Sequence, residues 1–427
     1  YDRHTHDGEG PVSSQIRVVV TGLGIVSPLG IGWQDTWESA LAGRSGAGPI
    51  TRFDASAHGC QIACEVTDFT PEDFIDRRAT RRMDRVSQFA VAAARLAADD
   101  AALDGAFDPD RAGTVISTGN GGSEAFETYH RSVLERGPDR ASPLQVPVMI
   151  VNMSTGHVAM QLGMRGPSSC LVTACASGNH GIGEAAAIIR RGAADVMIAG
   201  GSEAGITPYS MGGLDATRAL SRNNSEPTRA SRPFDVGRDG FVAAEGAGVL
   251  VLESLEHALA RGADIYCELS GYGASSDAHH LTEPDPTGRW QIAAMRAALE
   301  RGGFTPDDVD YVNAHGTSTP AGDPVEIGAI RTLLADRAPG VAVSSTKSMH
   351  GHGMGAAGGF EAVISALAVH HGAVPPTINV DTLDPECEGV DHVLGTARHM
   401  PVRLALSNSF GFGGHNAVLA LSRMGDQ

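Results

Sequence analysis

Short apolar runs alternate along this chain with alanine-rich segments whose apolar positions recur at helical spacing. Buried strands are predicted at 16–30, 111–119, 196–204, 246–254 and 309–316. Helices are predicted at 33–43 and 81–103. Strands that are apolar on both faces need helices to cover them, so the pattern predicts a layered α/β protein with buried sheets.

Two stretches of the sequence recur later in the same order. VVVTGLGIVS at 18–27 is matched by CELSGYGASS at 267–276. A strand, glycine-rich turn and alanine-rich helix at 171–192 are matched at 343–372. Chance likeness between alanine- and glycine-rich stretches can explain one such match, but two matches in the same order favour a duplicated βα unit.

We find no low-complexity linker that would separate independent domains. The expected organisation is a flexible N-terminal tail at 1–15, an N-terminal half at 16–265 and a C-terminal half at 266–427. In such a pseudo-symmetric core, equivalent strand ends converge. Side chains at matching points of the two halves are therefore expected to face one another.

Composition narrows the class of protein. The 427 residues are 42% hydrophobic and 19% charged, enough for a large core and unlike a disordered chain. The net charge, 32 − 50 = −18, argues against nucleic-acid or membrane partners, although a local basic patch could serve an acidic one. The first residues lack the apolar core of a signal peptide, and six scattered cysteines suggest no disulfide framework. We expect a soluble, cytoplasmic protein.

Cys175 stands in TACASG, between an apolar run that ends near Thr173 and an alanine-rich helical segment. A thiol there would meet the free N–H groups and positive end of the helix, which favour the thiolate that a nucleophile needs. Its small neighbours would let a substrate carbonyl come close. Most cysteines are instead buried structural residues, and Cys170 is interpreted in that way.

Two histidines are candidate partners of this thiol. His315 lies in NAHGTST at the end of an apolar strand, and His352 lies in KSMHGHGMGAAGG, at the point of the duplicated unit that matches Cys175. Convergence of the halves predicts that Cys175 and His352 face one another. A metal site is the alternative, but the chain has neither HExxH nor paired CxxC spacing, so no metal is expected.

The ordered motifs TACASG, NAHGTSTPAGDPVE, STKSMHGHGMGAAGG and NSFGFGGHNA resemble those of the elongating β-ketoacyl-acyl-carrier-protein synthases. The match is nearest to synthase II of fatty-acid synthesis and to the type II polyketide ketosynthases, and it runs from about Arg17 to Arg423. It implies an acyltransferase with the thiolase fold, in which two βαβαβαββ halves form a five-layered α/β/α/β/α sandwich.

The resemblance also implies a decarboxylative Claisen condensation. Cys175 matches the nucleophile that accepts an acyl chain from carrier-bound phosphopantetheine. His315 and His352 match the pair that decarboxylates malonyl-carrier protein, with neutral N–H groups that bind the developing enolate oxygen. The backbone N–H groups of Cys175 and Phe412 match the oxyanion hole of the second step. Because phosphopantetheine arrives on the carrier protein, no further cofactor is expected.

The same resemblance assigns the residues around this centre. They are Lys347 and Glu361 as charges that organise the histidines, Thr317 and Thr319 as hydroxyls that hold the pantetheine arm, Phe412, Asp277 and His280 as the gate, and Asn120, Leu214 and Gln145 as the acyl pocket.

A cluster of arginines forms a locally basic segment in this otherwise acidic chain. Five of them fall between residues 77 and 85, with Arg85 the last, and such a run is usually a solvated helix face. Carrier proteins are acidic, and the matching family segment is where they dock. The residues interpreted as a carrier-docking surface are Arg77, Arg78, Arg81, Arg82 and Arg218.

Two other classes of protein were weighed. A chain-length factor is a non-catalytic subunit of this fold that lacks the nucleophilic cysteine, so Cys175 with both histidines argues against it. A nucleotide-binding dehydrogenase is suggested by TGLGIVS after the first strand, but that segment lacks the third glycine of GxGxxG.

Departures from the fatty-acid pattern suggest the pathway. Asn120 falls where synthase II enzymes place an apolar pocket residue, and Gln145 where they place an aromatic one that reaches the neighbouring subunit's pocket. Burying an amide against a saturated chain costs about 1–3 kcal/mol. Our main interpretation is therefore a type II polyketide or polyene ketosynthase that pairs with a homologous, chain-length-factor-like subunit. The alternative is a homodimeric fatty-acid synthase II.

Overall fold

The computed structural model describes residues 16–425, and the tail expected at 1–15 lies outside the described residues. The principal strands from the N-terminal part of the chain are β1 (Val18–Ser27), β5 (Ala112–Ser117), β6 (Ser168–Ser169), β7 (Val196–Glu203) and β8 (Gly246–Ser254). Those from the C-terminal part are β9 (Cys267–Ser276), β10 (Tyr311–Asn313), β11 (Ala342–Ser344), β13 (Asp391–His392), β15 (Leu404–Gly411) and β16 (His415–Ser422).

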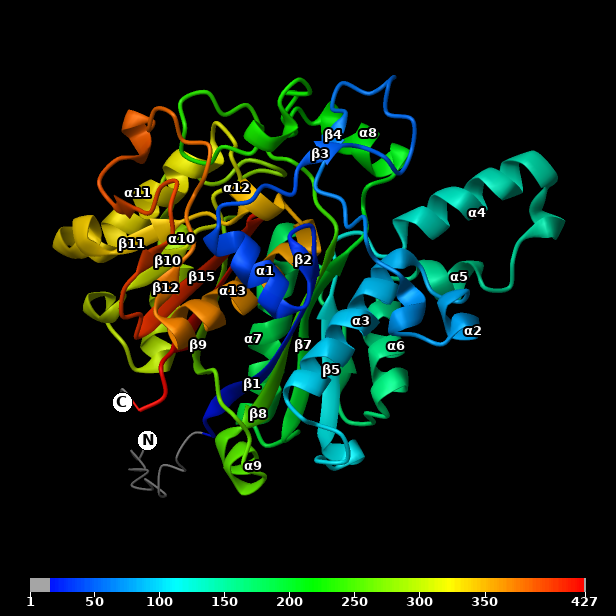
Figure 1. Ribbon diagram of the computed structural model, residues 1–427, viewed down its shortest axis with the longest axis horizontal. Helices are drawn as coiled ribbons and strands as arrows, with labels where there is room; N and C mark the ends of the chain where they lie inside the picture. The colour runs from blue at the N-terminus through cyan, green and yellow to red at the C-terminus, as the bar shows by residue number, and fades with distance from the viewer. Residues whose placement is uncertain (1–15, 426–427) are drawn as a thin grey trace, which may run out of the picture.

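The hydrogen-bonded order of these strands is β6-β5-β7-β8-β1-β9-β16-β15-β10-β11-β13 (Figure 1). Outward from the seam between β1 and β9, the N-terminal strands pair antiparallel, antiparallel, parallel and parallel. The C-terminal strands β9, β16, β15, β10 and β11 repeat that sequence of directions. This duplication confirms the predicted fold class.

Helices form layers on and between the two sets of strands. Their bounds are α1 (Trp33–Leu41), α3 (Arg85–Asp100), α6 (Met153–Leu162), α7 (Ser177–Arg190), α9 (Leu255–Ala260), α10 (Arg289–Gly302), α11 (Gly322–Leu334), α12 (Lys347–His350) and α13 (Ala357–His371). Helices α3 and α6 pack on the N-terminal strands, and α10 packs on β9 and β16 with α11 beside it. Helices α7 and α13 contact strands of both sets and each other, so they form the central layer.

The repeated Gly-x-Gly motif brings an outer helix close to each half. A Cβ at Gly24 in β1 would stand 1.9 Å from the backbone oxygen of Ala93 in α3. A Cβ at Gly273 in β9 would stand 1.9 Å from the backbone oxygen of Ala294 in α10. Since no side chain fits at either point, these glycines set the spacing between strand and helix.

The arginine-rich segment is not one continuous helix. A short helix, α2 (Arg77–Thr80), ends before α3 begins at Arg85, whereas the sequence pattern predicts a helix from residue 81. The carboxylate of Asp84 accepts a hydrogen bond from the backbone N–H of Val86 and caps α3, which sets where that helix starts.

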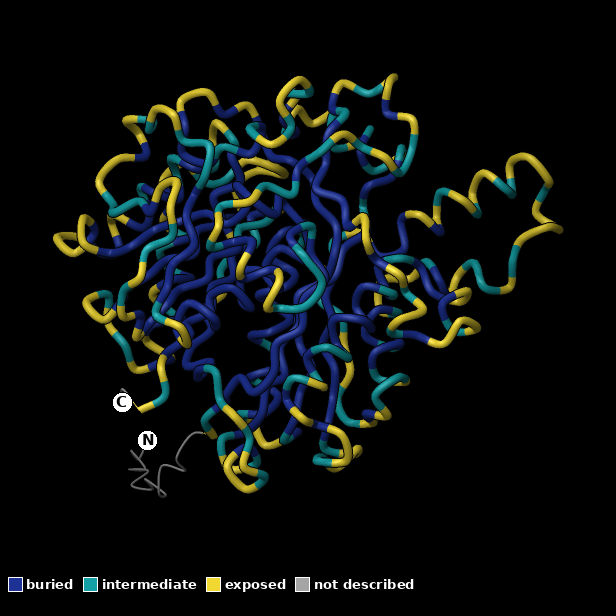
Figure 2. Tube along the Cα trace, in the orientation of Figure 1, coloured by how far each residue is buried: buried dark blue, intermediate teal, exposed yellow. Residues whose placement is uncertain are grey.

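An arm made of α4 (Ser123–Arg136) and α5 (Gln145–Met149) projects from the body of the molecule (Figure 1). The body is largely buried, whereas the arm carries many exposed positions (Figure 2). Leu134 on α4 is 73% exposed, and Val146 on α5 is 57% exposed.

The remaining short elements are β2 (Gly30–Ile31), β3 (Gly48–Pro49), β4 (Ile62–Ala63), α8 (Pro208–Ala216), β12 (Ala373–Val374) and β14 (Arg398–His399). Among them, β2 pairs with β1, and β3 with β4 and β12 with β14 form two small separate sheets. Between residues 16 and 425, we find no helix with the length and apolar character that crossing a bilayer demands.

Candidate active site

Cys175 sits in a 3₁₀ turn at Ala174–Ala176 that leads directly into α7. Ala174 adopts φ 50°, a left-handed conformation rare for a residue other than glycine, and the Oγ of Ser177 donates a hydrogen bond to its carbonyl. The thiol is 7% exposed and lines a cavity of about 360 Å³. The turn therefore presents Cys175 at the start of a central helix.

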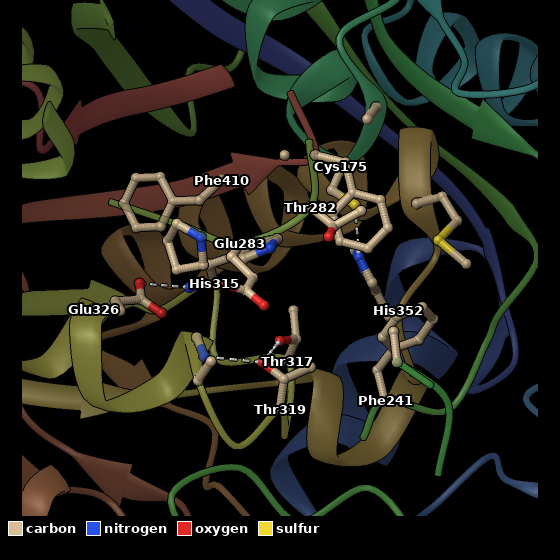
Figure 3. Close-up of a pocket in the computed structure, with 18 of the residues that line it drawn as sticks. Cys175, Phe241, Thr282, Glu283, His315, Thr317, Thr319, Glu326, His352 and Phe410 are labelled. Carbon is tan, nitrogen blue, oxygen red and sulfur yellow. Dashed lines mark hydrogen bonds between the residues drawn. The ribbon is translucent and has the colours of Figure 1, made fainter. Parts of the chain in front are cut away.

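His352 faces this thiol from the C-terminal half. Its Nε2 lies 3.0 Å from the Sγ of Cys175, and the two side chains point toward one another (Figure 3). The backbone N–H of His352 donates to the carbonyl of Val242 at 2.7 Å, and the ring of Phe241 packs edge-on against the imidazole at 5.0 Å. The structure confirms the predicted approach of Cys175 and His352 across the two halves.

His315 follows β10 and lies beside His352, with 5.4 Å between ring centroids and 87° between ring planes. The backbone N–H groups of His315 and Gly316 each donate to one carboxylate oxygen of Glu326 at 2.7 Å. Glu326 therefore holds the loop that carries His315. No role was predicted for Glu326, although it belongs to the NAHGTSTPAGDPVE motif.

Both imidazoles are strongly biased toward the neutral form. Burial holds the pKa of His315 and of His352 well below the ordinary histidine value, and the charge of Lys347 lowers both further. The Lys347 ammonium is buried and paired with the carboxylate of Glu361. A neutral imidazole retains an N–H that can donate to an oxygen on which negative charge develops.

The Cys175 sulfur is a thiol in this site. Burial raises its pKa to about 11, although Lys347 and the backbone N–H groups of Phe412 and of Cys175 itself lower it. Desolvation of the sulfur therefore opposes the bias toward the thiolate that the helix end is expected to give. The same two N–H groups point to the region of the sulfur.

The cavity brings together most of the other candidate residues. The hydroxyls of Thr317 and Thr319 lie 3.1 Å apart on one wall. Asn120 and Leu214 also line the cavity, and Asn120 is exposed to solvent. Gln145 is half-buried on α5 and does not line this cavity within the single chain.

Phe412 and Asp277 line the cavity where two loops meet. The carboxylate of Asp277 accepts a hydrogen bond from Asn416 at 2.7 Å, and the N–H of Gly413 donates to the carbonyl of Leu281 at 2.8 Å. His280 lies outside the cavity lining, and its Nδ1 accepts hydrogen bonds from backbone N–H groups in its own loop. The loops of Phe412 and Asp277 are thus joined to each other.

The candidate docking arginines are exposed. Arg77, Arg78, Arg81 and Arg82 all face solvent, and Arg218 does so at the rim of the cavity. Arg85 differs, because its guanidinium donates two hydrogen bonds to the buried carboxylate of Glu245 and lies 4.5 Å from the centre of the Phe89 ring. Its interpretation as part of the solvated cluster is therefore wrong.

The arrangement suits transfer of an acyl group to sulfur and stabilisation of an enolate. A thiol, two neutral imidazoles and the residues Cys175 and Phe412, whose backbone N–H groups lie near the sulfur, border one cavity, with hydroxyls on a neighbouring wall. Among residues 16–425, no group of three or more metal-ligating side chains is placed to hold an ion.

Family models match most of the chain. The beta-ketoacyl synthase N-terminal domain matches residues 15–258, and the beta-ketoacyl synthase C-terminal domain matches residues 266–381. The 3-oxoacyl-[acyl-carrier-protein] synthase 2 of Synechocystis sp. is 50% identical over 408 residues, covering 95% of this chain and 98% of that protein. The enzyme of the same name from Staphylococcus aureus is 50% identical over 413 residues, covering 96% and 99%.

Solved structures of similar fold include ketosynthases in complex with other proteins. One is a type II polyketide acyl-carrier protein in complex with its ketosynthase bound to the hexaketide, with 34% identity and a TM-score of 0.89 over 96% of this chain and 100% of that chain. Another is the ishigamide ketosynthase/chain length factor, with 38% identity and a TM-score of 0.88 over 96% and 100%.

Proposed function

Because this chain belongs to the β-ketoacyl synthase family, and is a 3-oxoacyl-acyl-carrier-protein synthase, we propose that it elongates fatty acyl chains in the manner of synthase II. The observation that carries the proposal is the 3.0 Å approach of Cys175 Sγ to His352 Nε2, with His315 on the same cavity. The curated relatives at 50% identity support fatty-acid elongation more strongly than the polyketide structures at 34% and 38%.

In the first half-reaction, Cys175 takes the acyl chain. Its Sγ attacks the thioester carbonyl of the acyl-carrier protein while the thiol proton passes to Nε2 of His352 at 3.0 Å. The pantetheine thiolate leaves and takes up that proton. The products are acyl-Cys175 and free carrier thiol, and we assign binding of the arm to Thr317 and Thr319, which line the same cavity.

In the second half-reaction, malonyl-carrier protein loses CO2. The electron pair of the broken C–C bond forms an enolate, whose oxygen receives an N–H donor from neutral His315 and one from neutral His352 in the tautomer that carries its proton on Nε2, the opposite tautomer to the one that accepts the thiol proton. The enolate carbon attacks the acyl-Cys175 carbonyl, and the N–H groups of Cys175 and Phe412 hold that oxyanion. Collapse releases the β-ketoacyl-carrier protein and the Cys175 thiolate, which takes one proton from solvent to regenerate the thiol.

Asn120 favours a second candidate, a polyketide or polyene ketosynthase with a homologous partner. Its amide lines the cavity beside Cys175, where it would meet a growing chain. Exposure of Asn120 to solvent weakens this reasoning, because an amide that keeps its water carries little of the desolvation cost. We therefore place fatty-acid elongation first.

The proposed partners are an acyl carrier protein and a second homologous subunit. Exposed Arg77, Arg78, Arg81 and Arg82 form a basic surface suited to an acidic carrier. The α4–α5 arm offers exposed Leu134 and Val146, apolar surface that a second subunit would cover. In the fatty-acid case that subunit is a copy of this chain.

The test assays the purified chain alone against saturated acyl-carrier proteins of increasing length, with mass spectrometry of the β-ketoacyl products and native mass for the assembly. We expect elongation by a homodimer, and none by Cys175→Ala. Inactivity that a co-expressed, cysteine-free homologue rescues would overturn the fatty-acid proposal in favour of the polyketide one.

A further inference from the structure

Glu203 is a buried acid beside the site that the proposed steps do not use. It ends β7, is 0% exposed, and meets backbone N–H groups and one hydroxyl. The N–H groups of Gly119 and Gly355 donate to Oε2 at 2.8 and 3.1 Å, and the N–H of Asn120 donates to Oε1 at 3.3 Å. The hydroxyl of Thr118 donates to Oε1 at 3.2 Å.

The duplicated fold makes Gly355 the counterpart of Cys175, so the predicted match of His352 to Cys175 is wrong by three residues. The 3₁₀ turn at Ala174–Ala176 opens α7, and the 3₁₀ turn at Met354–Ala356 opens α13. The first residue of each turn is left-handed, with φ 50° at Ala174 and φ 47° at Met354. Each turn packs against the end of a strand from the other half, β15 at the Cys175 turn and β7 at the Gly355 turn.

The two strand ends differ in whether they offer a hydrogen-bond acceptor to the turn. The end of β15 at Gly411 packs against the Cys175 turn, where a Cβ on Gly411 would lie 3.1 Å from the Cys175 nitrogen. The end of β7 packs against the Gly355 turn and supplies the carboxylate of Glu203 to the Gly355 N–H. One copy of the turn is open to an oxyanion, and the other copy already holds an anion.

We propose that Glu203 is a positioning residue that occupies the second copy of the oxyanion-binding turn and ties the acyl-pocket loop at 118–120 to the turn that follows His352. The inference rests on the proposed condensation at Cys175. Only the Cys175 copy then receives substrate, and a single carboxylate sets both walls of the cavity.

The cavity lining explains why this tie matters. Gly119 and Asn120 from one loop and Met354 from the other turn all line it beside Cys175. The two segments touch, since a Cβ on Gly355 would lie 2.3 Å from the nitrogen of Gly119. His352 lies three residues before Gly355, so a shift of this turn changes the distance from His352 to Cys175.

The charge of Glu203 has a separate effect on the thiol. Burial raises the pKa of Glu203 to about 7, and its N–H donors oppose that rise. Its carboxylate raises the pKa of Cys175, whereas the ammonium of Lys347 lowers it. Removing the Glu203 charge therefore makes the thiol more acidic, which loss of packing alone does not do.

The test compares Glu203→Gln, Glu203→Asp and a control, Glu268→Gln. Glutamine keeps the shape but turns an NH2 toward backbone donors, so transfer of an acyl group from carrier to Cys175 falls by about tenfold or more. The pH midpoint of Cys175 alkylation by iodoacetamide moves lower in Glu203→Gln and stays nearer its original value in Glu203→Asp. Glu268, a buried carboxylate paired with Arg17, leaves both readings unchanged when replaced.

Acyl transfer within twofold of the unaltered enzyme, or an unmoved alkylation midpoint in Glu203→Gln, would overturn the proposal. Should Glu203→Gln fail to fold, Thr118→Val removes one donor and is expected to slow acyl transfer by about fivefold; an unchanged rate counts against the proposal. Alkylation needs no carrier substrate, so failure of the unaltered enzyme to condense would reject the proposed function while leaving the test of Glu203 readable.

Discussion

The buried side chain of Lys347 lowers the pKa of the titratable groups that line the site. Its buried ammonium is neutralised by Glu361, lowers the pKa of both histidines, and partly offsets the effect of burial on Cys175. Burial also raises the pKa of Glu361 to about 7, and its pairing with Lys347 opposes that rise. Burial keeps His315 and His352 neutral, and this cation strengthens the effect without adding net charge to the cavity.

Substitution of His315 and substitution of His352 should affect the two half-reactions differently. His352 contacts Cys175 Sγ, whereas His315 contacts the ring of His352. We expect His315→Ala to accept an acyl group at near its original rate but to lose decarboxylation of malonyl thioester by about 100-fold or more. His352→Ala should slow both steps. Acyl-enzyme mass and CO2 release measure the two steps independently.

Circular dichroism serves as the control, since both variants should fold as the unaltered chain does. Full decarboxylation by either variant, or equal loss of acylation in both, contradicts the assigned roles.

The chemistry-bearing residues were predictable from motifs, but their surroundings were less so. Cys175, His315 and His352 stand at strand ends or glycine turns, and the duplicated pattern predicted that Cys175 and His352 meet. The ionisation of Cys175 was not predictable, because burial by distant segments decides it. Glu203 and Glu326 carried only a weak signal, an acid that follows or neighbours an apolar strand, since their donors come from loops far away in the sequence.

At the scale of elements, glycine sets how closely helices approach the sheet. Gly273 on β9 faces α10 so closely that an added Cβ would stand 1.9 Å from the oxygen of Ala294 and 2.6 Å from the nitrogen of Ala298. Such contacts account for some of the 54 glycines among the 427 residues, such as Gly24 and Gly273.

Gly273→Ala is therefore expected to lower the free energy of unfolding by about 3 kcal/mol, because a backbone atom must move to admit the methyl group. Urea unfolding followed by circular dichroism measures the change. Gly328→Ala in α11 is the matched control, since no atom lies within 4 Å of its added Cβ, and it should stabilise the helix by about 1 kcal/mol. Equal stability of the two variants would contradict this explanation.

Element type was more predictable than element ends. The strand predicted at 246–254 coincides with β8, because a short apolar run of this length is typical of a buried strand. The helix predicted from residue 81 begins at Arg85 because Asp84 caps it. The carboxylate of Asp84 also accepts a hydrogen bond from the backbone N–H of Ala125 in α4, which helps to hold it in the capping position. A contact between residues so far apart in the sequence cannot be read from the local spacing of apolar residues, so the start of this helix was not predictable.

At the scale of the whole molecule, charge is distributed unevenly. The chain carries −18 overall, yet Arg77, Arg78, Arg81 and Arg82 are exposed together around α2. A surface of this sign opposes the general charge of the protein and would steer an acidic carrier toward one face.

Arg81→Glu combined with Arg82→Glu should raise KM for carrier-borne acyl substrates several-fold while leaving KM for small pantetheine thioesters near its original value. The difference should shrink as salt screens the charges. Steady-state kinetics at two ionic strengths measures it. Arg296→Glu, an exposed site on α10, is the control and should leave both KM values unchanged; equal loss on both substrate types would indicate a folding defect.

The joining of β1 to β9 has a consequence for synthesis of the protein on the ribosome. Cys175 comes from one side of that seam and His315 and His352 come from the other. The Phe412 amide follows nearly at the end of the described chain. A nascent chain therefore exposes its thiol long before the groups that act with it have been translated. It stays inert toward carrier-bound substrates until Phe412 has emerged, so translation through that residue is what switches the enzyme on.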